Sequence, residues 1–508
     1  MKLMMSLALI GILGATAGAE TPQINCTDLH ELRLPQTEVL SVEYKMAGPY
    51  TSMERSPSAQ KTHERLPGYC IVKLASHPSS DSDIRIELWL PEPDAWNGKF
   101  LGTGNGGYSS MMFYDQMAEG LARGYAVGAS DTGHPGDDMH FAIGHPEKVK
   151  DWAFRATHMM AEQGRAVSKA FYGKPLTHAY FRGCSTGGQQ ALSEAQRYPM
   201  DFDGIIAGDP GHDRAMLNVD FVKSWLATNP PDGPRFPAKK LPALHRAVIA
   251  ACDKDDGVVD GIITDPRTCR FDPASLRCAA GTNNDSCLTD AEIKAVQTLY
   301  DGPVRDKAGR QLYPGWTKSS EGGWGPYLVS APEPVRFTFW RLWIYGDPNM
   351  TPEQLQPEAA LARSRAMYPY IDATDPNLRP FAKRHGKLLL YHGWADPIVP
   401  SENSIEYYDA VKKTVGDQTE DFARLFMVPG MSHCGGGPGA TAFDMLGTLD
   451  AWVTEGKAPE RILATHLEDG KPTLTRPLCA YPLEAKWDGV HDTHNATSFT
   501  CAKPTKDR

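Results

Sequence analysis

The chain has 508 residues and a mass of 55.7 kDa, with 41% hydrophobic, 22% charged and 9% aromatic residues. This balance is typical of a globular protein and excludes a disordered or collagen-like chain. The net charge of −10 and the isoelectric point near 5.9 argue against a nucleic-acid-binding protein, because such proteins carry a basic excess.

Residues 1–19 have the pattern of a secretory signal peptide. Lys2 precedes an apolar run from Leu3 to Leu13 and an A-x-A cleavage pattern at residues 17–19. The run is shorter than the roughly 20 residues that a membrane-spanning helix needs, and no later segment is long and apolar enough to span. We therefore expect an exported protein, secreted or periplasmic, that has no membrane anchor.

From about residue 84 the chain alternates predicted strands with predicted helices. The strands are residues 84–90, 99–101, 125–130, 179–182 and 204–208, and the helices are residues 156–171 and 189–197. Residues 84–90 alternate as a half-buried strand does, whereas residues 125–130 have the continuous apolar character of a buried strand. Strands alternating with helices imply an α/β protein with a mainly parallel sheet.

The alternation stops near residue 215 and returns with an apolar strand at residues 387–392. The roughly 170 residues between are rich in Pro, Gly, Trp and Cys and are far too long for a connecting loop. We interpret residues 216–380 as an inserted lid domain, and residues 20–215 and 381–508 as the two parts of the core. The second part has a predicted helix at residues 407–411, a strand at 424–428, a loop at 429–438 and a helix at 442–455.

A glycine-rich turn joins the strand at residues 179–182 to the next helix. Its sequence, Gly-Cys-Ser-Thr-Gly at residues 183–187, matches the G-x-S-x-G pattern in the strand–turn–helix setting that this pattern requires. Such a turn is strained and projects the Ser185 hydroxyl above the sheet. Alone, the pentapeptide could be a plain turn, but its setting favours Ser185 as a nucleophile.

Serine needs a histidine to accept its proton and a carboxylate to orient that histidine. Asp396 and His433 each lie in a loop after a strand, in the order serine, acid, histidine that accompanies this turn. Asp209 is a rival acid, but the acid more often follows a later strand. His392 ends a strand and His134 precedes the serine, so we interpret both as structural.

Ester cleavage also requires N–H donors for the developing oxyanion. The backbone N–H of Thr186, directly after the nucleophile, is one candidate. The glycine cluster at residues 102–107 follows an early strand and is placed to supply the other, with Gly107 as the preferred donor. The alternative is that the cluster is only a flexible turn.

Ten cysteines in an exported chain indicate up to five disulfides. Three pairs are close enough in sequence to close local loops: Cys252 with Cys269, Cys278 with Cys287, and Cys479 with Cys501. Cys184 directly precedes Ser185 and Cys434 directly follows His433. A bond between these two cysteines would hold the serine turn against the histidine loop.

These residues resemble the tannase and feruloyl esterase family of α/β-hydrolases, which is marked by a Cys-Ser, Asp, His-Cys arrangement. Here Cys184-Ser185, Asp396 and His433-Cys434 carry it, and the resemblance extends from about Cys26 to Cys501. It implies an α/β-hydrolase core with a large inserted lid. It also implies five disulfides: Cys26 with Cys70, Cys184 with Cys434, Cys252 with Cys269, Cys278 with Cys287, and Cys479 with Cys501.

The resemblance further implies a structural calcium site in the lid, where residues 252–262 read Cys-Asp-Lys-Asp-Asp-Gly-Val-Val-Asp-Gly-Ile. The implied ligands are the side chains of Asp253, Asp256 and Asp260 and the carbonyls of Val258 and Ile262. This is chemically reasonable because calcium binds six to eight oxygens. Taken alone, an acid-rich loop is more often simply solvated.

The expected protein is therefore a serine carboxylic ester hydrolase that needs no organic cofactor. By resemblance its substrates are small esters of aromatic acids derived from plant cell walls or polyphenols: feruloyl or caffeoyl esters, with galloyl esters or mono(hydroxyethyl) terephthalate as alternatives. Six lid aromatics stack on such a ring or form the lid's own core: Trp324, Phe337, Phe339, Trp340, Trp343 and Tyr345. The other hypotheses are a calcium-dependent binding module with a vestigial hydrolase site, and an acyltransferase on the same scaffold.

Overall fold

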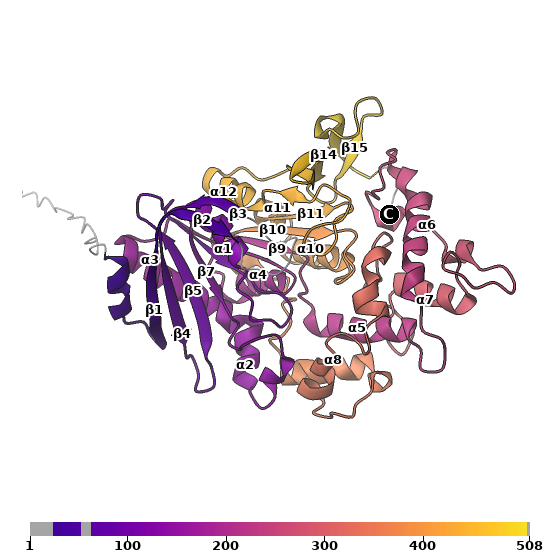
Figure 1. Ribbon diagram of the computed structural model, residues 1–508, viewed down its shortest axis with the longest axis horizontal. Helices are drawn as coiled ribbons and strands as arrows, with labels where there is room; N and C mark the ends of the chain where they lie inside the picture. Colours follow the sequence, from indigo (N-terminus) through magenta and orange to yellow (C-terminus); the bar gives the residue numbers. More distant parts are fainter. Residues whose placement is uncertain (1–23, 52–61, 505–508) are drawn as a thin grey trace, which may run out of the picture.

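The computed structural model describes residues 24–51 and 62–504, so the predicted signal peptide lies outside the described residues. A nine-stranded sheet forms the centre of the molecule (Figure 1). Its spatial order is β1 (Thr37–Lys45), β4 (Tyr69–Ser76), β5 (Ile84–Pro91), β7 (Ala126–Ser130), β6 (Lys99–Thr103), β8 (His178–Cys184), β9 (Gly204–Gly208), β10 (Lys387–Gly393) and β11 (Ala423–Val428). The pairings from β1 to β7 are antiparallel and those from β7 to β11 are parallel.

Helices cover both faces of the sheet (Figure 1). One face packs against α3 (Ala156–Tyr172), α4 (Thr186–Arg197) and α10 (Glu402–Val415), and the other packs against α1 (Tyr114–Ala122) and α12 (Met445–Glu455). Every residue of β7 and of β9 is buried, as expected for strands covered on both sides. The α/β class and the mainly parallel sheet are therefore confirmed.

Most predicted elements occur within a few residues of their expected bounds, and two predictions need correction. The segment 84–90 is not half-buried: in β5 only Arg85 is exposed, because helices lie on both sides of it. The predicted helix 442–455 begins three residues late. Ala442–Phe443 forms the short strand β12, and Asp444 then caps α12 by accepting the N–H of Gly447.

The predicted lid segment contains α5 (Arg214–Thr228), α6 (Leu241–Cys252), α7 (Asp290–Tyr300) and α8 (Pro357–Met367), which lie on one side of the sheet (Figure 1). The short helix α9 (Arg379–Lys383) begins at the end of this segment and packs through Phe381 in the core cluster of the sheet. The apolar faces of α5, α6, α7 and α8 share one hydrophobic cluster. That cluster also includes Tyr108 and Trp152 from the first part of the chain. The lid therefore packs as an extension of the core, and its division at residues 215 and 380 stays a prediction.

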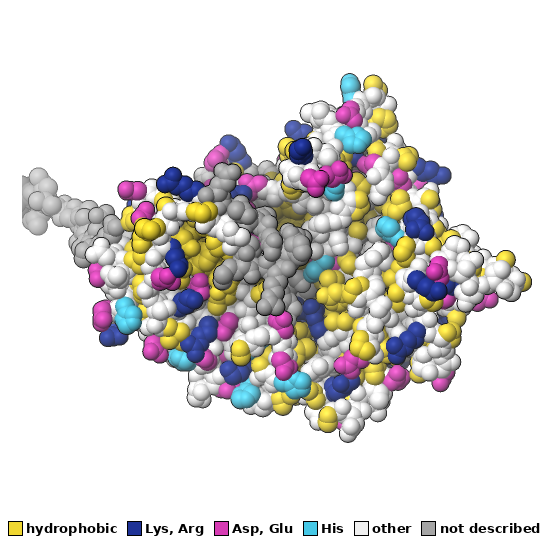
Figure 2. Space-filling view, viewed as in Figure 1, with side chains coloured by type: hydrophobic (Ala, Val, Ile, Leu, Met, Phe, Trp, Pro, Cys, Tyr) yellow, Lys and Arg dark blue, Asp and Glu magenta, His cyan; other side chains and the backbone are white. Residues whose placement is uncertain are grey.

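The C-terminal part adds two small sheets above β11. β12 pairs with β13 (Arg461–Glu468) and β14 (Lys471–Cys479), and β15 (Glu484–Trp487) pairs with β16 (Phe499–Ala502). The remaining strands and α-helices of the described residues are β2 (Gly48–Thr51), β3 (Thr62–Leu66), α2 (Pro146–Lys150) and α11 (Thr419–Phe422). None of the helices in the described residues has the length and apolarity needed to cross a bilayer. On the face shown in Figure 2, acidic and basic side chains are interspersed.

Candidate active site

Ser185 lies at the tight turn between β8 and α4. Its backbone has φ 63° and ψ −118°, a conformation that costs free energy in a non-glycine residue and that turns the side chain away from both elements. Gly183 makes the turn possible, because a Cβ there would lie 2.4 Å from the backbone of Gly187. The backbone N–H of Ser185 donates to the carbonyl of Gly208 on the neighbouring strand. The turn therefore has the geometry that the sequence pattern predicts.

Asp396 and His433 meet at the same edge of the sheet, in the loops that follow β10 and β11. His433 Nδ1 lies 2.7 Å from Asp396 Oδ2, and Asp396 Oδ1 accepts the N–H groups of Ile398 and Val399. Burial alone would raise the pKa of Asp396, but the facing imidazoles hold it well below its usual range. An ionised Asp396 fixes the proton of His433 on Nδ1 and leaves Nε2 as a proton acceptor.

Ser185 and His433 line one pocket of about 430 Å³, which we call the active-site pocket. The disulfide between their neighbours, Cys184 and Cys434, holds those two Cα atoms 5.9 Å apart. The structure therefore gathers the three predicted catalytic residues at one edge: the serine and histidine through the pocket and disulfide, and the aspartate through its hydrogen bond to the histidine.

The two histidines interpreted as structural are both buried. His134 stacks on Phe141 with ring centroids 3.7 Å apart, and burial lowers the pKa of His134 to about 4. His392 is fully buried behind the site, where Nδ1 pairs with the Ser404 hydroxyl and Nε2 lies 3.1 Å from the Val399 carbonyl. Neither histidine lines the active-site pocket.

Asp209, the rival acid, is fully buried beside Asp396, but its hydrogen bonds are with backbone N–H groups and not with His433. Its carboxylate accepts the N–H groups of Gly393 and Cys434. Burial raises the pKa of Asp209, and the charge of Asp396 adds to this effect. His392 lies near both carboxylates, and although burial lowers its pKa, they raise it above the usual value. Asp209 thus positions the loop that carries the histidine.

Of the two predicted oxyanion donors, Thr186 follows the serine in the chain and Gly107 lines the same pocket. Thr186 is the first residue of α4, and N–H groups in a first helical turn have no partner within the helix. Gly107 lines the active-site pocket and has φ 56°, in the left-handed region that suits glycine. The N–H of Gly187 donates to the carbonyl of Asn105, which ties the glycine cluster to the nucleophile turn.

The apolar wall of the active-site pocket was not foreseen from the sequence. It consists of Tyr108, Met111, Phe113, Tyr327 and Ile398. The six lid aromatics named in the sequence analysis are absent from the described lining; five are buried in the lid cluster, and Tyr345 packs against it. Tyr108 directly follows the glycine cluster and Phe113 lies in the same loop, which is a signal that could have pointed to them. Tyr327 lies in a lid segment that carries no such signal.

The structure contains the five disulfides that the family resemblance implies. Four of them close loops of 9 to 44 residues, whereas Cys184–Cys434 joins positions 250 residues apart. No cysteine of the described residues is free. The long-range bond therefore joins the Ser185 turn to the His433 loop. We call this edge of the sheet, with the candidate residues Ser185, Asp396 and His433, the catalytic edge.

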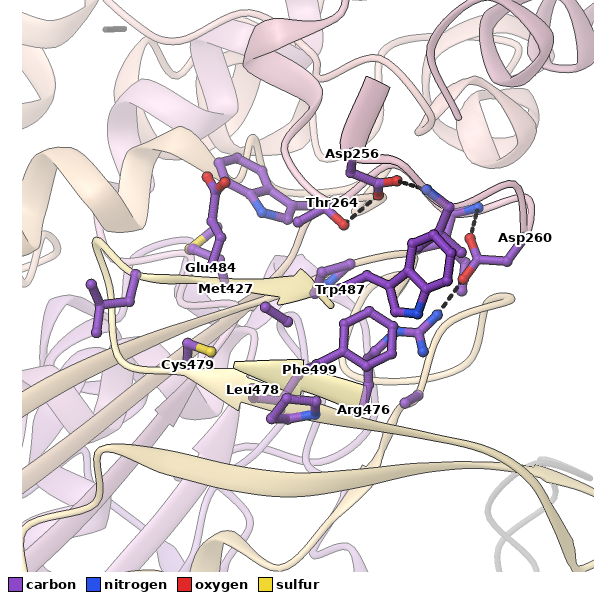
Figure 3. A pocket seen from close by; sticks show the side chains of 18 of the residues that line it. Asp256, Asp260, Thr264, Met427, Arg476, Leu478, Cys479, Glu484, Trp487 and Phe499 are labelled. Carbon is purple, nitrogen blue, oxygen red and sulfur yellow. Dashed lines mark hydrogen bonds and ion pairs between the residues drawn. The ribbon is translucent and has the colours of Figure 1, made fainter. Parts of the chain in front are cut away.

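The acidic loop at residues 253–262 packs against the C-terminal strands (Figure 3). Asp253 Oδ1 accepts backbone N–H groups from residues 260–262, Asp256 accepts the Thr264 hydroxyl at 2.6 Å, and Asp260 pairs with Arg476. Burial raises the pKa of Asp256 and of Asp260, and neighbouring carboxylates add to both shifts.

These three carboxylates, with the carbonyls of Val258 and Ile262 in the same loop, are oxygen donors of the kind that suits a hard cation such as Ca²⁺. In the described residues, the ligand atoms of the three carboxylates do not all lie within 4.8 Å of one another. The donor chemistry therefore fits calcium, although the loop's own amides, Thr264 and Arg476 engage the carboxylates.

Comparison with known proteins agrees with this geometry. A profile of the family described as tannase and feruloyl esterase matches residues 70–502. An uncharacterized esterase of Xanthomonas campestris pv. campestris is 34% identical over 98% of this chain and 94% of its own length, and "Probable feruloyl esterase B-2" of Aspergillus terreus is 32% identical over 93% and 94%. The crystal structure of feruloyl esterase B from Aspergillus oryzae matches with a TM-score of 0.86 and 30% identity, over 93% of this chain and 98% of that chain.

The match spans the catalytic edge, the lid and the C-terminal strands together. The chain therefore belongs to the tannase and feruloyl esterase family, a family of carboxylic ester hydrolases with the α/β-hydrolase fold.

Proposed function

We propose that this protein is a serine hydrolase that cleaves esters of aromatic acids, with feruloyl or caffeoyl esters as its preferred class. The observation that carries the proposal is the 2.7 Å contact between Asp396 and His433, with His433 and Ser185 in one pocket. The aromatic and apolar wall of that pocket supports a planar aromatic acyl group. The feruloyl esterases among its relatives support the same substrate class.

In the proposed reaction, Ser185 Oγ attacks the ester carbonyl while His433 Nε2 takes the hydroxyl proton. The N–H groups of Thr186 and Gly107 donate to the oxyanion that forms. The C–O bond to the alcohol then breaks, and His433 gives its proton to the departing oxygen. Water attacks the resulting acyl-enzyme by the same steps, releasing the acid and restoring Ser185. Asp396 stabilises the imidazolium form of His433 in both halves.

The test is the turnover of Ser185→Ala, with Ser193→Ala as a control because Ser193 is a buried serine on the adjacent helix α4. We expect Ser185→Ala to lower kcat by about 10⁴-fold or more with little change in melting temperature, because the nucleophile is lost while packing is retained. Ser193→Ala should keep most of its activity. Retained turnover in Ser185→Ala would exclude it as the nucleophile.

A substrate panel separates the acyl classes. Methyl ferulate, methyl gallate, chlorogenate and a terephthalate monoester are compared by kcat/KM, since this ratio measures discrimination between substrates. A preference for ferulate and chlorogenate supports the proposal, and a preference for gallate indicates a tannase. An acyltransferase would instead pass the acyl group to added alcohol more efficiently than to water.

We also propose that the acidic loop binds a structural calcium ion, held by Asp253, Asp256 and Asp260 with the carbonyls of Val258 and Ile262. Support comes from the donor set and from the raised pKa values of Asp256 and Asp260, which a divalent cation would offset. The bound ion would supply positive charge that ties the lid loop together. The chemistry at Ser185 needs no metal.

Finally, we propose that the protein is exported and cleaved after Ala19. The five disulfides support an oxidising compartment. N-terminal sequencing of the protein recovered from the periplasm or the medium should give Glu20 as the first residue. Recovery in the cytoplasm with residues 1–19 intact would contradict export.

A further inference from the structure

Three ionisable side chains meet beside the paired helices α3 and α4, and none of them lines the active-site pocket. They are His158 from the first turn of α3, Glu194 from α4, and Asp201 from the turn that leads from α4 to β9. One ligand atom of each residue lies within 4.8 Å of those of the other two. We call these three residues the helix-pair cluster.

Glu194 is a fully buried acid that lacks a donor. Its side chain is 0% exposed, and within the described residues neither of its carboxylate oxygens has a hydrogen-bond partner. The group that faces it is the carboxyl group of Asp201, which is also buried. No lysine or arginine in the described part of the chain forms an ion pair with either carboxylate. Two carboxylates in contact repel each other unless a proton or a cation lies between them.

His158 has the surroundings that a metal-binding histidine needs. Its Nδ1 lies 2.6 Å from Asp201 Oδ2, its ring stacks on Tyr198 with centroids 3.7 Å apart, and its Nε2 lies 3.6 Å from Glu162 Oε1. A metal-bound histidine commonly turns its other nitrogen toward a carboxylate, which fixes the ring and raises its basicity. The side chain of His158 is 20% exposed, so an ion can reach the cluster from solvent.

A proton shared by Glu194 and Asp201 is the alternative to a cation. Burial raises the pKa of Glu194 well above its usual value, and the charge of Asp201 adds to the shift, so Glu194 is protonated when no cation is bound. A proton, however, joins only the two carboxyl groups. The imidazole nitrogen and the two carboxylates together form a donor set that suits Zn²⁺, and the two carboxylates balance its charge.

We propose that the helix-pair cluster binds a divalent transition cation, Zn²⁺, through His158 Nδ1 and the carboxylates of Glu194 and Asp201. Binding displaces the proton of Glu194 and the hydrogen on Nδ1 of His158, while Nε2 keeps its hydrogen toward Glu162. The ion fastens α3 to α4, the helix that begins directly after Ser185. The acidic loop of the lid offers only oxygen donors, so the two sites differ in the cation they suit.

The test is Zn²⁺ binding by the full chain, produced without a histidine tag, stripped of metal and held in excess Ca²⁺ so that the acidic loop does not compete. Calorimetric titration measures affinity, and mass spectrometry of the eluted metal counts the ions. We expect one tightly bound Zn²⁺ per chain, with a higher melting temperature because the ion stabilises the folded state. Glu194→Gln and His158→Phe should each weaken binding by about 100-fold or more, since loss of an outer-shell partner alone costs about 10- to 100-fold.

Asp220→Asn is the matched control, because Asp220 is a fully buried acid on α5 that lies outside the cluster. It should bind Zn²⁺ as the wild type does. His158→Phe keeps a ring against Tyr198 and changes a partly exposed position, so it decides the outcome if Glu194→Gln does not fold. No binding by the wild type would mean that a proton alone joins the two acids, which overturns the proposal. Unchanged binding in His158→Phe, or an equal loss in Asp220→Asn, would place the ion elsewhere and overturn it as well.

Discussion

The catalytic edge and the acidic loop of the lid both bury several carboxylates, but they hold them in different ways. At the edge, Asp396 faces two imidazoles and two backbone N–H groups, and its pKa is held well below the usual range despite burial. In the loop, burial raises the pKa of Asp256 and Asp260, and no histidine contacts them among the described residues.

The difference indicates what each cluster can do. An imidazole beside an ionised carboxylate can accept a proton and return it, so the edge is equipped for acid–base chemistry. Carboxylates that raise one another's pKa are held at a cost in free energy that a cation offsets, so the loop is suited to a structural ion. We therefore expect changes at the edge to lower turnover and changes in the loop to lower stability.

The largest expected effect separates the two acids at the edge. Asp396→Asn should lower kcat by about 10⁴-fold, because asparagine does not hold His433 in the reactive tautomer. Asp209→Asn should lower it by less than about tenfold, since Asp209 accepts backbone N–H groups and does not contact the histidine ring through a hydrogen bond. Steady-state kinetics on methyl ferulate measure both. Similar losses in the two variants would mean that the acid is misassigned.

The next effect compares a disulfide of the edge with one of the lid. Replacing Cys184 and Cys434 together by Ala should lower kcat by roughly tenfold and the free energy of unfolding by about 2 to 4 kcal/mol, because the bond positions the histidine loop as well as restricting the unfolded chain. The lid pair Cys278 and Cys287 closes a short loop, and its replacement should lower stability alone. Urea unfolding and kinetics on both variants check this. Unchanged kcat in the first would show that the bond has no positioning role.

The catalytic edge was largely predictable from the sequence because its chemistry is local. The pattern around Ser185 fixes a strained turn within five residues, and Asp396 and His433 lie in the loops that follow apolar strands. The disulfide partners of the edge were different. Cys184 and Cys434 are 250 residues apart, and only the family resemblance indicated their bond.

The rest of the fold depends on long-range packing that single-sequence patterns do not encode. Strand β1 is mostly exposed and carries little apolar periodicity, and only its pairing with β4 makes it a strand. The lid aromatics gave a strong signal for burial but none for the direction in which they face. For the same reason the apolar wall of the active-site pocket emerged only from the structure, since Tyr108 and Tyr327 come from distant segments.

A smaller effect is expected from removing the ion of the loop. Chelation should lower the melting temperature by a few degrees, because a bound ion stabilises only the folded state, while activity at low temperature should stay unchanged. Differential scanning calorimetry with a chelator and with added Ca²⁺ measures the shift. Asp256→Asn serves as the control and should no longer respond to Ca²⁺. No shift in the wild type would contradict the proposed ion, and a parallel loss of activity would contradict its purely structural role.

The smallest effect concerns the pH dependence of stability at the edge, where the two acids act in opposite directions. The pKa of Asp396 is lowered on folding, so its contribution is present above the usual aspartate pKa of about 4 and is lost as pH falls toward the folded value. Burial raises the pKa of Asp209, with Asp396 adding to the shift and the facing histidines, His392 and His433, opposing it. Its contribution is therefore greatest below pH 4 and declines as pH rises through the folded value.

Asp209→Asn removes only the second of these dependences. The free energy of unfolding of the variant, relative to the wild type, should therefore increase as pH rises above about 4, because the wild type alone then bears the cost of an ionised Asp209. Urea unfolding of both proteins at pH 4.5 and pH 7 measures this difference at each pH. A difference that is constant with pH would show that Asp209 titrates alike in the folded and unfolded states. A difference of opposite sign would mean that the histidines lower the pKa of Asp209 as they lower that of Asp396. The contrast between the two acids would then disappear.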